Sequence, residues 1–265
     1  MGQYTGLENK KILIVEDVEL NQFLARHIME SWGCVVQIAE NGALAVDKIN
    51  SNDFDLVLMD IQMPIMDGLE ATRQIRKLQD DRKSSIPIVA LTANAMRNNF
   101  DMFINAGMND CLGKPFEEPA LFRTVCKNLR ENKNSSMTVS AVPEPAPKIV
   151  SAAKLYDLSM VEAISAGDRS FIGKMLKLFL DTVPASLKEM RTHTDKREWQ
   201  ELSKVAHKLK STVDSMGIAE IQPLIRQVES SSKTGSNVEG IPALVKNIME
   251  VMDRVMAQVK KDYSL

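Results

Sequence analysis

The sequence has few cysteines, few aromatic residues and no long apolar run. The three cysteines are odd in number and far apart, which excludes a disulfide scaffold and favours reduced thiols in a cytoplasmic chain. No run approaches the roughly 18 apolar residues that a membrane-spanning helix needs. No basic segment followed by an apolar stretch stands at the start. We therefore expect a soluble, unexported chain that makes no direct membrane contact.

Neither sign of charge is in excess. The chain has 33 basic and 35 acidic side chains, for a formal net charge of −2. So small a charge creates no global field that would hold nucleic acid, and we expect no nucleic-acid partner. With 265 residues, of which 44% are hydrophobic, the chain is long enough for two domains that each bury a core.

Short apolar runs alternate with amphipathic stretches in the first half of the chain, a pattern typical of repeated βα units. Three runs are continuously apolar, as expected of central parallel strands that helices cover on both faces. We expect five such units in a domain of residues 8–133. The predicted strands are residues 12–15, 35–39, 56–59, 86–91 and 110–112, and the predicted helices are residues 21–32, 43–50, 69–78, 98–106 and 117–132.

The composition changes after this domain. Residues 134–153 are rich in Ser, Ala and Pro and have no apolar period, so we interpret them as a flexible linker. In residues 154–265, apolar residues recur at spacings of three and four, which predicts an all-α helical bundle. Pro184 should bend or interrupt the second helix. The predicted helices are residues 160–164, 170–193, 196–216, 218–231 and 241–262.

Polar side chains follow the predicted strands at their carboxyl ends, where open parallel sheets bind ligands. Three carboxylates at one sheet edge would raise one another's pKa unless a cation lay among them. Hard oxygen ligands favour Mg²⁺, so the three acidic residues predict a magnesium site. The acidic residues are Glu16, Asp17 and Asp60, and they are joined by Thr92 and Lys114.

Asp60 ends the central strand, where its carboxylate could attack phosphorus and form an aspartyl phosphate. The hydroxyl of Thr92 and the ammonium of Lys114 would align the phosphoryl oxygens and neutralise their charge. A single acidic residue at a strand end is best interpreted as part of a solvated loop. Five polar residues at matching strand ends favour a site for phosphoryl transfer.

The motifs around these residues resemble the response-regulator receiver domain. They are Ile-Leu-Ile-Val-Glu-Asp at 12–17, Met-Asp-Ile-Gln-Met-Pro-Ile-Met-Asp-Gly at 59–68, Leu-Thr-Ala at 91–93 and Gly-Lys-Pro-Phe at 113–116. The resemblance implies a flavodoxin-like α/β fold with phosphorylation on Asp60.

The same resemblance implies a particular set of metal ligands. Mg²⁺ would be held by Asp17 and Asp60, with help from Glu16 and from the backbone carbonyl of Gln62. Thr92 and Lys114 would take the roles of the family's phosphoryl-sensing hydroxyl and ammonium. One position departs from the pattern, because family members that switch an output surface often have an aromatic residue where Cys111 stands. We therefore expect phosphate to pass through this domain rather than to switch it.

His207 is the candidate phosphate carrier of the second domain. The helix predicted around it has an apolar stripe on one face, and His207 lies well off that core face. An exposed imidazole is largely neutral near pH 7, so a ring nitrogen would be free to attack phosphorus. Lys210 and Ser211, one turn further on, could bind the resulting phosphate, which Asp214 would mildly oppose. The stripe is Leu202, Val205, Ala206, Leu209, Val213 and Met216.

The frame Ala-His-Lys-Leu-Lys-Ser at 206–211, with Met-Gly at 216–217, resembles the histidine phosphotransfer (HPt) domain. This resemblance implies a four-helix core that carries phosphate on His207 without using ATP. The family commonly has glycine where Ser211 stands, so we expect an altered rate rather than lost function. An exposed histidine is more often only a surface residue, and we interpret His27 and His193 in that way.

The combined interpretation is a two-component phosphorelay protein that resembles the C-terminal part of a hybrid sensor histidine kinase. Its expected partners are an upstream histidine kinase domain, in the same or another polypeptide, and a downstream response-regulator receiver. Three alternatives remain open. An aspartyl-phosphate phosphatase would need an acid where Gln62 stands, a flavodoxin would need a phosphate loop where Glu16 and Asp17 stand, and an interaction scaffold would leave both residues unphosphorylated.

Overall fold

The computed structural model describes residues 4–92, 97–131 and 154–265. The chain divides into two compact units, residues 1–148 and 149–265. The segment expected to be a linker, residues 134–153, lies outside the described residues, as does Ala93 of the Leu-Thr-Ala motif. None of the helices in the described ranges combines the length and the hydropathy that a membrane crossing requires.

The first unit is built on a five-stranded parallel sheet with strand order β2-β1-β3-β4-β5. The strands are β1 Lys11–Val15, β2 Val35–Ala39, β3 Leu56–Asp60, β4 Ile88–Thr92 and β5 Asp110–Gly113. All five predicted strands are present. The strand predicted to start at residue 86 starts at Ile88, because Pro87 has no N–H group to donate to a ladder.

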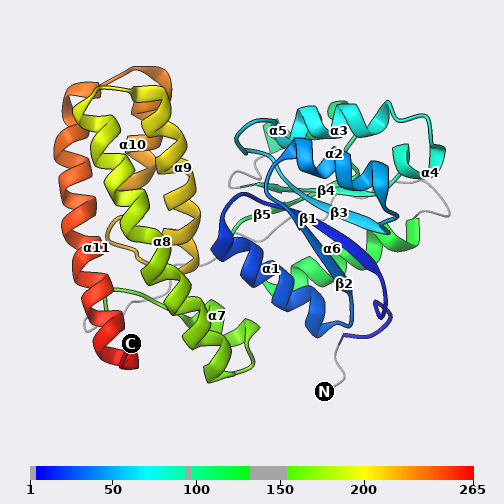
Figure 1. Ribbon diagram of the computed structural model, residues 1–265, viewed down its shortest axis with the longest axis horizontal. Helices are drawn as coiled ribbons and strands as arrows, with labels where there is room; N and C mark the ends of the chain where they lie inside the picture. The colour runs from blue at the N-terminus through cyan, green and yellow to red at the C-terminus, as the bar shows by residue number, and fades with distance from the viewer. Residues whose placement is uncertain (1–3, 93–96, 132–153) are drawn as a thin grey trace. The chain divides into compact units, whose positions relative to one another are not determined.

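Helices cover both faces of this sheet (Figure 1). The helices α2 Gly42–Ser51, α3 Gly68–Arg76 and α5 Arg97–Ala106 lie on one face, and α1 Glu19–Ser31 and α6 Glu118–Glu131 lie on the other. A short helix, α4 Asp81–Ser84, was not expected from the sequence, because four residues are too few to show an apolar period. The flavodoxin-like α/β fold is thereby confirmed.

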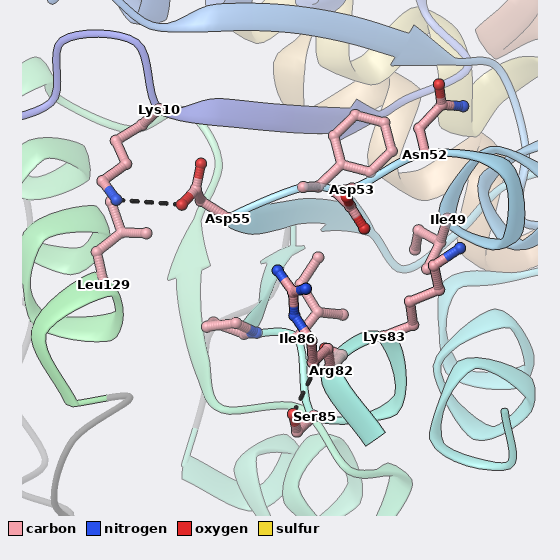
Figure 2. A pocket seen from close by; sticks show the side chains of 12 residues that line it. Lys10, Ile49, Asn52, Asp53, Asp55, Arg82, Lys83, Ser85, Ile86 and Leu129 are labelled. Atoms are coloured by element: carbon pink, nitrogen blue, oxygen red, sulfur yellow. Dashed lines mark hydrogen bonds and ion pairs between the residues drawn. The ribbon is translucent and has the colours of Figure 1, made fainter. Parts of the chain in front are cut away.

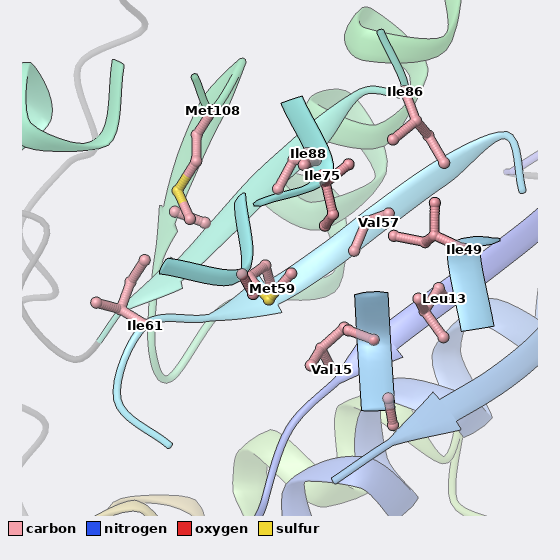
Figure 3. Close-up of a cluster of buried hydrophobic side chains, with 14 of the residues drawn as sticks. Leu13, Val15, Ile49, Val57, Met59, Ile61, Ile75, Ile86, Ile88 and Met108 are labelled. Carbon is pink, nitrogen blue, oxygen red and sulfur yellow. The ribbon is translucent and has the colours of Figure 1, made fainter. Parts of the chain in front are cut away.

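Alternation along the strands divides the core between the two faces. Leu13 and Val15 of β1, with Val57 and Met59 of β3, point toward the α2 and α3 side, where Figure 3 shows them in one cluster with Ile75. These side chains are fully buried. The central strands are thus anchored on both faces, which fixes where their carboxyl ends lie.

The second unit is a helical bundle, as expected. A short helix, α7 Ser159–Ile164, precedes the long helices α8 Arg169–Asp195, α9 Trp199–Ser215, α10 Gln222–Thr234 and α11 Ile241–Tyr263, and η1 Val238–Gly240 is a 3₁₀ turn. Each long helix packs against the next, and α11 packs back on α8, which closes a four-helix core. Of the bend or interruption expected at Pro184, the interruption is absent, because α8 continues through Pro184. Pro184 lies on the exposed side of α8, where water can solvate the carbonyl that loses its donor.

Candidate functional sites

Asp60, Thr92 and Lys114 meet at the carboxyl edge of the sheet. Asp60 is the last residue of β3 and Thr92 the last of β4, while Lys114 directly follows β5. The backbone N–H of Lys114 donates to the carbonyl of Thr92 at 2.7 Å, which holds the ends of β4 and β5 together. Thr92 is 7% exposed. The sheet thus brings these three residues together, as expected of residues at the carboxyl ends of parallel strands.

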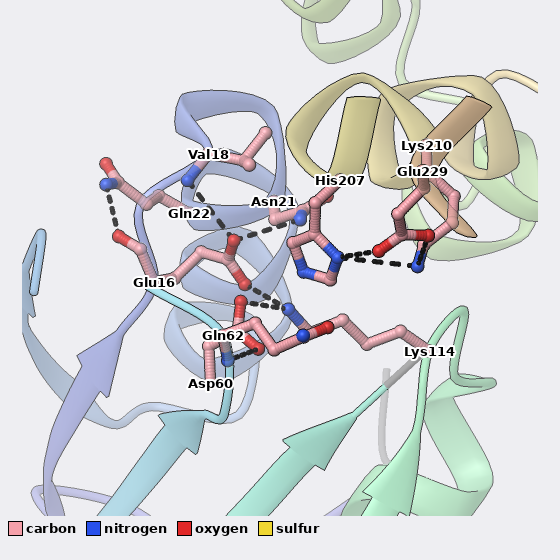
Figure 4. A network of polar contacts seen from close by, with 10 residues as sticks. All are labelled: Glu16, Val18, Asn21, Gln22, Asp60, Gln62, Lys114, His207, Lys210 and Glu229. Carbon is pink, nitrogen blue, oxygen red and sulfur yellow. Dashed lines mark hydrogen bonds and ion pairs between the residues drawn. The ribbon is translucent and has the colours of Figure 1, made fainter. Parts of the chain in front are cut away.

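Lys114 joins two carboxylates at this edge (Figure 4). Its Nζ lies 2.6 Å from Glu16 Oε2 and 2.7 Å from Asp60 Oδ2. The other Glu16 oxygen accepts from the backbone N–H of Val18 at 3.2 Å and from the amide of Asn21 at 3.0 Å. Glu16 is therefore held on both oxygens, and its clearest role is to position the ammonium of Lys114 beside Asp60.

Charge and burial compete at Asp60. Burial raises its pKa to about 6, Lys114 opposes that increase, and Glu16 and Asp17 add to it. Burial would by itself lower the pKa of Lys114, but Glu16 and Asp60 raise it above its ordinary value, so the ammonium stays charged. The site therefore holds a carboxylate whose ionised form is poorly compensated by the protein alone.

The acidic residues of this edge fit a divalent cation. One carboxylate oxygen each of Glu16, Asp17 and Asp60 lies within 4.8 Å of the other two. Three carboxylates and the Lys114 ammonium leave a formal charge of −2, which one divalent cation balances. Carboxylate oxygens of this kind are the ligands that Mg²⁺ prefers.

The loop from β3 to α3 is fixed against Asp60. The N–H of Gly68 donates to the carbonyl of Ile61 at 3.0 Å. A Cβ atom at Gly68 would lie only 2.0 Å from the backbone oxygen of Asp60, so no larger residue fits without a shift of the loop. The N–H of Gln62 lies 3.4 Å from Asp60 Oδ1, a long hydrogen bond. This loop therefore packs directly against the backbone of Asp60 and helps to position its carboxylate.

In the helical unit, His207 and Lys210 of α9 share one partner on α10, Glu229 (Figure 4). His207 Nδ1 lies 2.5 Å from Glu229 Oε1, and Lys210 Nζ donates to Glu229 Oε2 at 2.6 Å. The side chains of His207, Lys210 and Glu229 are 14%, 10% and 15% exposed. The hydroxyl of Ser203 also donates to the backbone carbonyl of Glu229, at 3.3 Å.

Glu229 determines which nitrogen of His207 can react. Burial would raise the pKa of Glu229, but hydrogen bonds from His207 and Lys210 outweigh it and lower the pKa to about 2. A carboxylate that is ionised and this close to Nδ1 requires the proton of a neutral ring to be on Nδ1. The lone pair of the neutral imidazole is then on Nε2, the nitrogen available to a phosphoryl group.

The contact of Glu229 with His207 was not predicted from the sequence, and His207 is less exposed than predicted. The apolar stripe of α9 is buried as expected, yet the polar face is covered in part by α10, because a helical wheel contains no information about a neighbouring helix. Asp214, expected to oppose phosphate, is engaged by Arg226 through two hydrogen bonds of 3.0 and 2.8 Å. Its charge is therefore compensated within the bundle.

A pocket of about 420 Å³ lies at the other edge of the sheet, where the strands begin (Figure 2). Lys10 and Asp55, paired at 3.1 Å, line it together with Lys83 and Arg82. It is separate from the carboxylates at the strand ends.

Two family models match this chain. Residues 12–126 match the response regulator receiver domain, and residues 174–259 match the Hpt domain. The fold and the paired sites are those of a two-component signalling protein. The chain belongs to the proteins in which a response regulator receiver domain is followed by an Hpt domain.

Two of the relatives with matching sequence are sensor proteins of bacteria. The aerobic respiration control sensor protein ArcB of Escherichia coli is 29% identical over 95% of this chain and 30% of its own length. The sensor protein GacS of Pseudomonas syringae is 31% identical over 93% of this chain and 28% of its own length. The chain thus spans less than a third of these relatives.

A solved structure resembles the first unit. The receiver domain of the sensor histidine kinase PA1611 of Pseudomonas aeruginosa, with a magnesium ion in its active site cleft, is 36% identical, with a TM-score of 0.43. The match covers 46% of this chain and 98% of that one.

Proposed function

We propose that this chain is a relay segment in which Asp60 accepts a phosphoryl group and His207 carries one. The observation that carries the proposal is the buried Asp60 carboxylate, paired with Lys114 at the strand ends and set close to two further acidic residues. The Asp60 carboxylate is the nucleophile of the site and Lys114 its fixed cation. His207 pairs with the half-buried carboxylate of Glu229 and lies beside Lys210.

The step at Asp60 exchanges one bond for another. A carboxylate oxygen of Asp60 forms an O–P bond while the P–N bond to a donor phosphohistidine breaks, and the electron pair of that bond returns to the imidazole nitrogen. Lys114 neutralises charge on the phosphoryl oxygens, and the Thr92 hydroxyl donates a hydrogen bond to them. Mg²⁺ held by Asp17 and Asp60, with the carbonyl of Gln62, would supply the remaining positive charge.

The step at His207 is a transfer in the opposite direction, from an aspartyl phosphate to a histidine. The Nε2 lone pair forms a P–N bond while the O–P bond of an aspartyl phosphate breaks, and its electron pair returns to the carboxylate. Formation of the bond puts positive charge on the imidazole ring, and the carboxylate of Glu229 at Nδ1 stabilises that charge. Lys210, whose Nζ lies 3.4 Å from Nδ1 and is paired with Glu229, is the cation that would bind a phosphoryl oxygen.

We further propose the direction of flow. An upstream histidine kinase domain donates to Asp60, and His207 passes the phosphoryl group to a separate response-regulator receiver. Cys111, where an aromatic switch residue would stand, packs against the hydrophobic cluster of the first unit, which supports phosphate transfer rather than an aromatic-gated output.

The test uses acetyl phosphate and Mg²⁺ on the full chain and on Asp60→Asn and His207→Gln variants. An aspartyl phosphate is lost in alkali, whereas a phosphohistidine is stable in alkali and lost in acid. We expect alkali-labile phosphate in the His207→Gln variant and none in the Asp60→Asn variant. Equal alkali-labile labelling of both variants would contradict the assignment of Asp60.

A further inference from the structure

Ile65, in the loop that follows Asp60, combines two costly features. Its side chain is 86% exposed, more than any other large apolar side chain in the described part of the chain. Its backbone φ is +70°, in the left-handed region that β-branched residues rarely adopt. An exposed apolar side chain on a strained backbone does not stabilise the folded unit, so its presence points to a use outside it.

The backbone around Ile65 explains how the strain is held. The N–H of Met66 donates to the carbonyl of Pro64 at 2.8 Å, which closes a three-residue γ-turn with Ile65 at its centre. The carbonyl of Met66 accepts from the N–H of Gly42 at 3.0 Å, and Gly68 anchors the far end of the loop beside Asp60. The turn is fixed on both sides, and Ile65 projects from a rigid support.

We propose that Ile65 is an apolar docking anchor for the protein surface that carries the phosphohistidine. The inference rests on the proposed function, because it concerns the partner of Asp60. Any histidine that exchanges a phosphoryl group with Asp60 must reach bonding distance of the phosphorus. The body of the partner must then cover the loop that directly follows Asp60. A rigid apolar side chain on that loop is desolvated when the partner arrives and released when it leaves.

The occupant that fits is the α9 surface around His207, presented by a second copy of this chain. Lys204, which also pairs with Glu201 at 2.7 Å, and Lys208 lie on that helix within one turn of His207. Their charge is opposite to that of Asp67, the exposed acid two residues after Ile65. Ser211, one turn after His207, is small and leaves room for an apolar side chain beside the ring. Opposite charges and the small side chain of Ser211 are what favour this occupant.

The experiment measures transfer between two full-length copies. One copy carries His207→Gln, and its Asp60 is loaded with acetyl [³²P]phosphate and Mg²⁺ before excess donor is removed. The second copy carries Asp60→Asn. Alkali-stable phosphate then arises only by transfer to His207 of the second copy. The rate at which acetyl phosphate loads Asp60 is measured separately on the same His207→Gln copy. Acetyl phosphate is too small a donor to need docking.

Three substitutions in the loaded copy separate docking from other effects. Ile65→Asn removes the apolar side chain but keeps a residue that tolerates positive φ, and Ile65→Leu keeps an apolar side chain. Val35→Asn changes another exposed apolar residue, 51% exposed, at the start of β2 and thus at the far edge of the sheet. We expect the ratio of transfer rate to loading rate to fall about tenfold for Ile65→Asn, and by less than about threefold for the other two.

Each other outcome has a distinct meaning. The docking inference is wrong if the His207→Gln copy that keeps Ile65 transfers no phosphate to the second copy. It is also wrong if Ile65→Asn leaves the ratio of transfer rate to loading rate unchanged. An equal fall in loading and transfer would mean that Ile65 acts through the shape of the loop, which also overturns the inference. If acetyl phosphate labels none of the loaded copies, the proposed function itself fails.

Discussion

Replacing Asp60 with asparagine should stabilise the metal-free first unit at neutral and alkaline pH. The fold raises the pKa of Asp60 to about 6 from an ordinary value of 3.8. For an acid whose pKa is raised on folding, the penalty is absent below the ordinary value, grows as pH rises through about 4 to 6, and is constant above. At ~1.4 kcal/mol per pH unit, that difference corresponds to about 3 kcal/mol at pH 8.

Urea unfolding in EDTA tests this prediction. A Trp199→Phe background leaves Trp32, which is 3% exposed, as the fluorescent reporter of the first unit. Asp60→Asn should raise the free energy of unfolding by about 2–3 kcal/mol at pH 8 and by only about 1 kcal/mol at pH 4.5. Asp53→Asn, a change at an exposed acid, should have no such effect.

Mg²⁺ should stabilise the chain with Asp60 more than the Asp60→Asn variant, because a cation that binds only the folded site stabilises the folded state by mass action. It should raise the unfolding midpoint of the chain with Asp60 and much less that of Asp60→Asn. No stabilisation by Asp60→Asn at pH 8, or a stabilisation that is as large at pH 4.5 as at pH 8, would refute the reasoning from burial and charge.

Three further predictions concern the other parts of the two sites. Lys114→Ala should slow loading by acetyl phosphate about a hundredfold, measured as alkali-labile phosphate, because the fixed cation of the site is lost. Glu229→Ala should slow transfer to His207 about tenfold or more. Glu229→Gln should slow transfer less, because the amide oxygen can still accept a hydrogen bond from Nδ1. Equal effects of the two substitutions would contradict the role given to Glu229. Gly68→Ala should lower the free energy of unfolding by about 1–3 kcal/mol and slow loading, since its Cβ would collide with the backbone of Asp60; unchanged loading would show that the loop does not position the carboxylate.

The site at the sheet edge could be predicted from the sequence because a parallel sheet collects its functional residues in a simple way. Asp60, Thr92 and Lys114 are far apart in the chain, but each ends or follows an apolar run, and such runs end at one edge. What could not be predicted is the division of roles. Nothing in the spacing shows that Glu16 positions Lys114 rather than only contributing to a metal site.

The histidine site was less accessible to sequence reasoning. His207 and Lys210 are one turn apart on the same helix, so their proximity follows from helix geometry. Glu229 is 22 residues later on another helix, and its approach depends on how α10 packs on α9. The exposed γ-turn at Ile65 was equally invisible, because an isoleucine within an apolar stretch gives no sequence signal of positive φ.

The most direct test of the account is to locate phosphate on the intact chain after a pulse of acetyl phosphate and Mg²⁺. Borohydride reduction followed by peptide mass spectrometry marks an aspartyl phosphate, and alkaline digestion preserves a phosphohistidine. The account predicts that the first label is on Asp60, and that the later alkali-stable label is on His207 and absent from the Asp60→Asn variant. Label that appears first on another acid, or on His207 without Asp60, would contradict it.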